Sequence, residues 1–366
     1  MARKRKSDRV LFRTTVLLVA LSVVMVYSAS AVVALDRYQQ AHFFLTKQLM
    51  WAALGIAVLG LVMRVDYHVY REPAFIWSCL GIVGLGLVAV LFSQPVNSVR
   101  RWFSIGGLGI QPSELAKLAA ILFSAALLER RMHRINEVRY SLVPIGVVVA
   151  ALVGLILAEP DFGTSMSLAL IATVMVFAAG LNYRYIVGTV LTVGPVLLLV
   201  ALGAAYRRRR LWSFLNPWED PLGDGFQAIQ SFIAVGTGGL FGRGLMNSVQ
   251  KLFYLPEPHT DFIYAVIAEE FGLIGATFVL ACFCIITWRG LRVALRAPDA
   301  FGSLAAFGLT AMVAMQAFIN MSVVLGLLPT KGIPLPFVSA GGSSLLISLV
   351  GIGVLLNVSQ HASSET

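Results

Sequence analysis

The sequence has few charged residues. Only 13% of its 366 residues are Asp, Glu, Lys or Arg, whereas soluble globular chains carry about 25%. Hydrophobic residues make up 58% of the chain, and the mean hydropathy is +0.82. The composition therefore excludes a soluble globular protein and indicates an integral membrane protein.

Cysteine and nucleotide-binding motifs are also scarce. Cys79, Cys282 and Cys284 all lie in apolar runs, a pattern that supports neither a disulfide framework nor a zinc site. The glycine run at 236–244, GTGGLFGRG, lacks the GxxxxGK[ST] pattern and follows no strand, so it does not predict nucleotide binding. The net charge of +10 does not indicate a nucleic-acid partner, because the Lys and Arg residues punctuate apolar segments instead of clustering on a soluble module.

Long apolar runs dominate the chain. A membrane-spanning helix needs about 20 mostly apolar residues, and candidate spans lie near 11–34, 47–65, 73–92, 113–129, 141–158, 163–181, 185–206, 262–288, 301–326 and 336–357. We therefore predict an all-α, polytopic integral membrane protein with about ten transmembrane helices. Its residues 1–366 are expected to form a single membrane domain.

The segment 207–261 forms a large loop between predicted helices 7 and 8. Its stretch 228–246 is too rich in glycine, and contains Arg243, so it makes a poor lipid-facing helix. We expect short helices or re-entrant backbone there, packed where water or protein satisfies the polar groups.

Lys and Arg are distributed unevenly over the predicted loops. One set of loops holds sixteen of them, Arg3, Lys4, Arg5, Lys6, Arg9, Arg13, Arg64, Arg71, Arg130, Arg131, Arg134, Arg139, Arg184, Arg289, Arg292 and Arg296. The opposite short loops hold five, Arg37, Lys47, Arg100, Arg101 and Lys331. Because cytoplasmic loops are enriched in Lys and Arg, both termini are predicted to be cytoplasmic and the 207–261 loop extracytoplasmic.

A polar run at 252–275 leads directly into an apolar helix. It carries Glu257, His259 and Asp261, and its two prolines hold the chain extended before the helix begins. A carboxylate beside a membrane helix costs at least about 2.5–3.5 kcal/mol unless it is hydrated or paired, so Asp261 is a functional candidate. A helix cap is the alternative interpretation, and the sequence leaves both open.

Two further clusters lie on the predicted outer side. The first, 97–117, contains Arg100 and Arg101 and then Glu114 and Lys117, which are three residues apart on one helical face. An ion pair that fixes helix packing explains Glu114 and Lys117 as well as a ligand site does. The second is a short turn at 158–164 that contains Asp161, for which a simple turn with a helix cap is the local interpretation.

Two clusters combine basic residues with broken backbone. Arginines at 207–210, among them Arg207 and Arg210, adjoin Trp212 and suit either an interfacial anchor or a phosphate-bearing lipid. Their outer position favours the lipid. The run 327–346 carries Lys331 and Ser339 among three prolines, and such irregular backbone either lines a cavity or forms a kinked packing element.

These stretches resemble the SEDS family (shape, elongation, division and sporulation), which comprises the FtsW, RodA and SpoVE proteins of bacterial cell-wall synthesis. The similarity covers RRW and QPSELAK in 100–117, EPDFGT in 159–164, SFLNPWEDP and GFQAIQS in 213–231, GRG and LPEPHTDFIYAVIAEEFGLIG in 242–275, and LLPTKGIPLPFVSAGGSSLL in 327–346. Lys331 within PTKGIPLPF is similar to the FtsW and SpoVE branch. Ala340, where the family usually has Tyr, and Asn97-Ser98, where Gly-Ala is common, depart from the family pattern.

The resemblance implies a peptidoglycan glycosyltransferase that polymerises lipid II at the outer face of the bacterial cytoplasmic (inner) membrane, at the division septum, and releases undecaprenyl diphosphate. By the family pattern Asp261 is the catalytic carboxylate. The substrate-binding candidates are Arg100, Arg101, Glu114, Lys117, Asp161, Arg207, Arg210, Arg243, Glu257, His259, Lys331 and Ser339.

The expected reaction needs a base for the acceptor hydroxyl and positive charge for the leaving diphosphate. A divalent cation, Mg²⁺ or Mn²⁺, held by Asp261 would supply that charge too, and the sequence leaves this open. The implied partners are lipid II, membrane lipids, a class B penicillin-binding protein that acts as transpeptidase, and other division proteins. The alternatives are a lipid II translocase and a non-catalytic scaffold of the division machinery.

Overall fold

The computed structural model describes residues 7–94, 99–105, 108–185, 187–188, 191, 194–195, 199, 203 and 205–362. Within these residues seven helical segments are long and apolar enough to cross a membrane. They are α1 (Arg9–Tyr38), α2 (Phe43–Val62), α3 (Pro73–Val90), η3 (Val138–Leu142) continued by α5 (Val143–Ala158), α10 (Ile263–Arg296), α11 (Ala300–Val324) and α12 (Gly342–His361). The chain is therefore an all-α protein that passes through the membrane several times.

Two more helices lie where the sequence predicts spans. They are α4 (Pro112–Arg131), which starts at a proline as helices often do, and α6 (Phe162–Ala178), which has 17 residues. The predicted span 185–206 lies largely outside the described residues. The prediction that the last helix begins at 336 is wrong, because residues 336–341 belong to the proline-containing loop before α12.

Short elements connect the long helices. The segment after position 204 contains α8 (Ala205–Leu215), η4 (Pro217–Glu219) and α9 (Phe226–Gly238), and α9 confirms the expectation of a short helix in 228–246. The 3-10 helices η1 (Tyr67–Arg71) and η2 (Met132–Arg134) follow α2 and α4.

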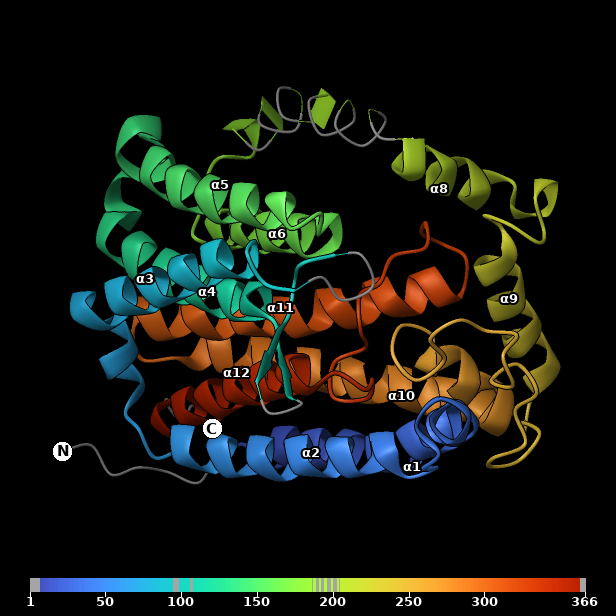
Figure 1. Ribbon diagram of the computed structural model, residues 1–366. Coiled ribbons are helices and arrows are strands. Elements are labelled where there is room, and N and C mark those ends of the chain that lie inside the picture. The colour runs from blue at the N-terminus through green and yellow to red at the C-terminus, as the bar shows by residue number, and fades with distance from the viewer. Residues whose placement is uncertain are drawn as a thin grey trace.

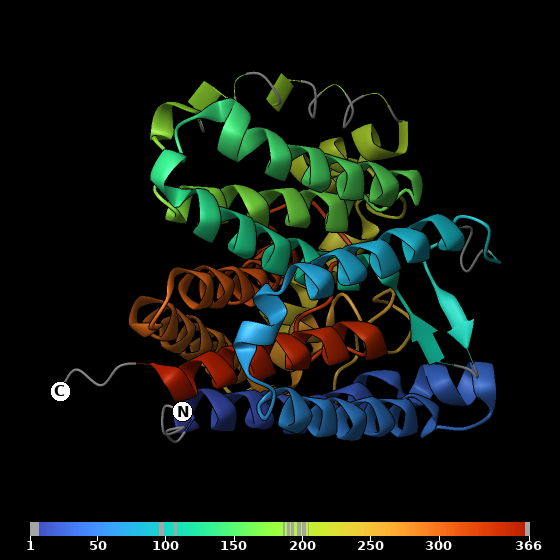
Figure 2. The same cartoon turned by 90° about the vertical axis from the view of Figure 1, so that its left-hand side faces the viewer.

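The chain also forms a small β-hairpin, which the sequence analysis does not predict. Strands β1 (Phe103–Ile105) and β2 (Leu108–Ile110) pair antiparallel, with Phe103 opposite Ile110 and Ile105 opposite Leu108. Figure 2 shows the two strands side by side, outside the stack of helices.

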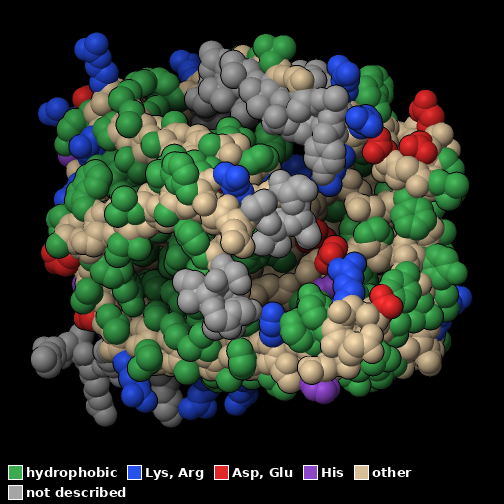
Figure 3. All heavy atoms as spheres, viewed as in Figure 1, with side chains coloured by type: hydrophobic (Ala, Val, Ile, Leu, Met, Phe, Trp, Pro, Cys, Tyr) green, Lys and Arg blue, Asp and Glu red, His purple; other side chains and the backbone are tan. Residues whose placement is uncertain are grey.

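The helices run side by side, and α11 lies at their centre (Figure 1). It packs against α10, α4, α6 and α12. In the most apolar 18-residue stretch of each helix, 67% of α11 and 78% of α12 are buried inside the protein. In the helix that ends at Ala158 only 22% of that stretch is buried. Figure 3 shows hydrophobic side chains over much of one face, as expected where helices contact lipid.

Both described ends of the chain lie at the same end of the bundle (Figure 1). The amide of Asp8 donates to the hydroxyl of Ser359 at 3.1 Å, and Arg289 at the end of α10 pairs with the Asp8 carboxylate at 2.6 Å. Asp8 also caps α1 by accepting from the amides of Val10 and Leu11. The loops before α9 and before α12 lie at the opposite end of the bundle.

Helix α10 is broken at Gly272, whose backbone has φ 66° and ψ −159°. The freed backbone groups bond to residues 239–244, since Leu273 donates to the carbonyl of Gly239 and Gly244 donates to the carbonyl of Glu270, both at 2.9 Å. A Cβ atom at Gly242 would lie 2.1 Å from that same carbonyl oxygen. Glycine is therefore required here for two backbone segments to meet.

Candidate active site

The Asp261 side chain lies one residue before the α10 N-cap and is half-buried. The N-cap residue is Phe262, which makes no side-chain capping bond. Within the described part of the chain, no hydrogen bond to either oxygen of the Asp261 carboxylate is found. The interpretation of Asp261 as a helix cap is therefore wrong.

The segment around Asp261 is held by its backbone. The side-chain amide of Asn320 on α11 donates to the Asp261 carbonyl at 2.8 Å, and the Ser339 hydroxyl donates to the Thr260 carbonyl at 2.5 Å. The amide of Ala340 donates to the His259 carbonyl at 2.9 Å. The loop before α12, which the sequence predicts to line a cavity or to pack, thus fixes the position of Asp261.

Charged side chains from its own segment and from two other segments act on this carboxylate. Desolvation, with the negative charges of Glu257 and Asp161, raises the pKa of Asp261 to about 7, and the positive charge of Arg210 on α8 opposes that rise. Arg210 also donates to the carbonyl of Thr330 at 3.3 Å. Glu257, Asp161 and Arg210 are residues that the sequence places in the site, and they lie within electrostatic reach of Asp261.

Lys331 completes the positive side of this site. Its ammonium group lies 4.8 Å from the centre of the Phe162 ring and 3.5 Å from the sulfur of Met166. Desolvation lowers the pKa of Lys331 to about 8, and the Asp161 carboxylate opposes this. Lys331 is therefore closer to losing its proton at neutral pH than an exposed lysine is.

Asp161 has the local role that the sequence indicates. It caps α6 by accepting from the Thr164 amide at 3.1 Å, and it accepts from the Thr164 hydroxyl at 2.8 Å and from Gln111 at 3.1 Å. Gln111 immediately precedes α4, so the start of α4 is joined to the start of α6. The prediction of a turn with a helix cap is confirmed for Asp161.

The neighbouring turn contains an unpaired carboxyl. Glu159 is fully buried, and neither of its oxygens has a partner among the described residues. Desolvation, with the Asp161 charge, raises the pKa of Glu159 to about 8. Arg101 donates at 3.0 Å to the Glu159 carbonyl, not to its carboxylate. Arg101 therefore lies beside the Asp161 turn, whereas Arg100 donates to the carbonyl of Leu91 at 2.9 Å.

His259 lies against another aromatic ring. Its ring centre is 4.4 Å from that of Phe44, and its Nε2 is 3.8 Å from a Glu257 oxygen. Desolvation lowers the pKa of His259, and the nearby Glu257 opposes this shift. His259 is therefore a packed, buried group beside the site.

Three other predicted site residues are engaged elsewhere. Glu114 and Lys117 form a buried ion pair with each other at 2.8 Å, which is the packing alternative seen in the sequence. Arg243 lies 3.5 Å from the Glu269 carboxylate and donates its backbone amide to the Glu269 carbonyl. The Arg207 side chain lies outside the described residues.

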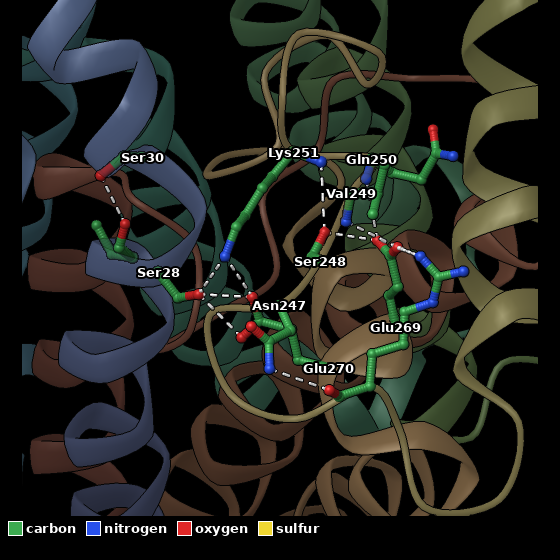
Figure 4. A network of polar contacts seen from close by, with 11 residues as sticks. Ser28, Ser30, Asn247, Ser248, Val249, Gln250, Lys251, Glu269 and Glu270 are labelled. Atoms are coloured by element: carbon green, nitrogen blue, oxygen red, sulfur yellow. Dashed lines mark hydrogen bonds and ion pairs between the residues drawn. The ribbon is translucent and has the colours of Figure 1, made fainter.

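Glu269 and Glu270 face the loop at 243–251, as Figure 4 shows. Glu269 accepts from the Ser248 hydroxyl at 2.5 Å and from the Val249 amide at 2.9 Å. Glu270 accepts from Lys251 at 2.7 Å and from the Ser28 hydroxyl on α1 at 2.6 Å. The two buried carboxylates are thus satisfied by the chain itself and are not offered to a ligand.

The sequence analysis misses two residues at the site. Asn320 is a lone polar residue in an apolar helix, and Gly332 lies so close to Asp261 that a Cβ atom there would be 2.9 Å from its Oδ2. Among the described residues no three His, Cys, Asp or Glu side chains gather in a way that could hold a metal ion. Asp261 is therefore a carboxylate with one cation, Arg210, and two further carboxylates, Glu257 and Asp161, within electrostatic reach.

Comparisons with known proteins show the family of the chain. A model of the FtsW/RodA/SpoVE family, described as cell cycle protein, matches residues 8–364. A probable peptidoglycan glycosyltransferase FtsW of Geobacter sp. (strain M18) is 43% identical over 360 residues, which is 98% of each chain. Stage V sporulation protein E of Bacillus subtilis is 44% identical over 362 residues, 98% of this chain and 99% of that protein.

Solved structures share the fold. A chain from a structure described as "Structural coordination of polymerization and crosslinking by a peptidoglycan synthase complex" superposes with a TM-score of 0.79 and 30% identity, covering 96% of this chain and 97% of that one. The rod shape determining protein RodA of Thermus thermophilus superposes with a TM-score of 0.72 and 28% identity, covering 98% of both chains. The chain therefore belongs to the FtsW/RodA/SpoVE family.

Proposed function

We propose that this protein is a peptidoglycan glycosyltransferase that polymerises lipid II into β-1,4-linked glycan strands and releases undecaprenyl diphosphate. The observation that carries the proposal is the Asp261 carboxylate, which has no protein hydrogen bond among the described residues and lies in a desolvated position within electrostatic reach of Arg210. The names of the FtsW relatives support the same activity.

In the proposed reaction Asp261 accepts the proton of the acceptor hydroxyl. The hydroxyl oxygen then forms a bond to the anomeric carbon of the donor as the bond from that carbon to the diphosphate oxygen breaks. A base with a pKa of about 7 is matched to neutral conditions, because it is both partly deprotonated and a strong proton acceptor. One carboxylate suffices, since the diphosphate leaves without the protonation that glycoside hydrolysis needs.

We propose that Arg101, Arg210 and Lys331 hold the diphosphate. Guanidinium groups match phosphate oxygens and stabilise the charge that develops on the leaving group. Glu257 and His259 shape the field around Asp261, and Ser339 fixes its backbone. Whether Mg²⁺ or Mn²⁺ assists is tested by chelation: activity that EDTA abolishes and either ion restores supports a cation at Asp261.

The test is synthesis of glycan from labelled lipid II by the purified protein. Asp261→Asn should lower the polymer yield by about 10²–10⁴-fold, the usual contribution of a general base. Asp224→Asn is the matched control, because Asp224 is exposed in the loop before α9. Normal polymer from the Asp261→Asn protein contradicts the proposal, and so does transbilayer movement of lipid II without polymer, the result expected of a translocase.

We also propose the topology predicted from the sequence: ten spans in a single membrane domain, both termini cytoplasmic, and the 207–261 loop outside. The contact between Asp8 and Ser359 supports termini on one side. A Glu257→Cys protein without the three native cysteines should react with an impermeant maleimide in intact cells. Reaction only after lysis contradicts this orientation.

Finally, we propose that the protein acts in the inner membrane at the division septum, together with a class B penicillin-binding protein. The fold shared with a chain of a peptidoglycan synthase complex supports a partner of this kind. Co-purification in mild detergent at native expression should recover a transpeptidase. Its absence from such preparations contradicts a stable complex.

A further inference from the structure

Asn320 joins two segments that are far apart in the sequence. Its side-chain amide nitrogen donates to the carbonyl of Asp261 and to the carbonyl of Ile333, each at 2.8 Å. Asn320 lies on α11 and is only 1% exposed. One buried amide group therefore ties both the segment before α10 and the loop before α12 to the central helix.

The orientation of this side chain is fixed by its partners. Both acceptors are carbonyl oxygens, so the NH₂ group must face them. The Asn320 Oδ1 atom is left buried, without a partner among the described residues. A buried unsatisfied polar atom is unfavourable, so an apolar residue would suit the interior of α11 better. The two bonds that the amide donates offset this cost.

Those two bonds set the surroundings of the catalytic carboxylate. Ile333 follows Gly332, and a Cβ atom at Gly332 would lie 2.9 Å from Asp261 Oδ2. The backbone at Gly332 thus lies beside the carboxylate and leaves no room for a side chain there. If the amide of Asn320 is removed, the Asp261 segment and the Gly332–Ile333 segment both lose their hydrogen bond to α11. Water can then enter between the two segments.

We propose that Asn320 is a positioning residue of the transfer reaction, whose amide holds the Asp261 segment against the Gly332–Ile333 backbone so that the carboxylate stays in a water-poor position. This inference rests on the function proposed above. Asn320 acts only through Asp261 and touches no reacting atom. The charged groups that also act on Asp261 are Glu257 on its own segment, Arg210 on α8, and Asp161 at the start of α6.

The first readout is the pH profile of polymerisation. Desolvation is the largest cause of the raised pKa of Asp261. Loss of the Asn320 amide should let water reach Asp261 and so lower that pKa. In Asn320→Ala the acid limb should move to lower pH by about one unit and kcat should fall roughly tenfold or more, with a much smaller change in KM. Asn320→Asp keeps the shape of the side chain, but it replaces the NH₂ donor by an oxygen that faces two carbonyl oxygens. This variant should lose at least as much activity as Asn320→Ala.

Asn357 provides a matched control. It is also a fully buried asparagine that joins two segments, since it donates to the carbonyl of Met63 and accepts from the amide of Tyr67. It lies at the opposite end of the bundle from Asp261, at the C-terminal end of α12. Asn357→Ala should lower thermal stability as much as Asn320→Ala does and leave the acid limb in place. A purely structural role of Asn320 predicts the same result for both variants.

The second readout does not depend on activity. A hydrophobic carbodiimide modifies protonated carboxyl groups, and mass spectrometry of the peptide with Asp261 measures the pH of half-maximal modification. This pH should be lower in Asn320→Ala than in the wild type and in Asn357→Ala. Asn320→Gln keeps the amide donor on a longer side chain. Its pH of half-maximal modification should therefore lie between the values for Asn320→Ala and the wild type.

The outcomes separate the two ideas. A shift in carbodiimide modification without any polymer from the wild type supports the role of Asn320 and contradicts the proposed function. Polymer from the wild type, with an unchanged acid limb and unchanged modification in Asn320→Ala and Asn320→Asp, overturns the role of Asn320. If Asn320→Ala does not fold, as size-exclusion chromatography would reveal, Asn320→Ser, which also lacks the amide, carries the same comparison.

Discussion

Gly332 offers a direct test of how closely the Asp261 carboxylate, the proposed general base, is covered. A Gly332→Ala substitution would place a methyl carbon 2.9 Å from Asp261 Oδ2, whereas unstrained heavy-atom contacts lie at about 3.5–4.0 Å. Either the Lys331–Ile333 backbone or the carboxylate must move, and overpacking of this kind costs about 1–3 kcal/mol. If the whole cost falls on the transition state, kcat/KM decreases about 5-fold to 150-fold, since about 1.4 kcal/mol corresponds to a factor of ten.

The assay is polymerisation of labelled lipid II under initial-rate conditions, with thermal unfolding in the same detergent. Gly341→Ala is the matched control, because its added Cβ would be 3.7 Å from the Ser344 Cβ, an ordinary contact. We expect Gly341→Ala to keep a near-normal kcat/KM. Gly332→Ala should remain folded but show the decreased kcat/KM. Unchanged kcat/KM in Gly332→Ala would refute the close cover of Asp261.

Three further predictions follow from buried charges. The polymerisation rate should rise with pH through about 7, because Asp261 acts as a base only when deprotonated and its pKa is raised to about 7; the measurement is a pH–rate profile. Lys251→Met or Glu270→Gln alone should destabilise the protein by about 3–5 kcal/mol in thermal unfolding, whereas Lys251→Met with Glu270→Met should recover much of the loss. The Glu159 pKa rises from 4.5 to about 8 on folding, so its contribution to stability is full below pH 4.5 and lost as pH rises to 8; in Glu159→Met this dependence of Tm on pH should disappear.

The helices could be predicted well because their signal is local. An apolar run of about 20 residues specifies a membrane helix whatever surrounds it, and the nine predicted positions that the structure describes all carry helices. The break at Gly272 could not be predicted in this way, since it depends on backbone contacts with residues 239–244. The β-hairpin had a signal in Gly106-Gly107, a two-residue turn sequence, which a search for long apolar runs passes over.

The site was predictable only in part, because some of its contacts join residues that are far apart in the sequence. Asp261, Lys331 and Ser339 stand out because prolines and polar groups interrupt apolar sequence near them. Asn320 does not stand out, because its partners Asp261 and Ile333 are 59 and 13 residues away. Arg243 had the right charge, but its actual partner is Glu269, a pairing that depends on how the loop folds back onto α10.

The paired charges at 243–251 and 269–270 have a consequence for the assembly of the protein in the membrane. The basic residues precede the acidic ones in the chain, so they emerge first from the ribosome. A carboxylate in a membrane helix costs at least about 2.5–3.5 kcal/mol until it is paired, and both glutamates lie in the first third of α10. The helix therefore gains its full stability in the bilayer only after the preceding loop has folded back and Ser28 of the first helix has met Glu270. Insertion of this span is thus coupled to tertiary contacts made by segments synthesised before it.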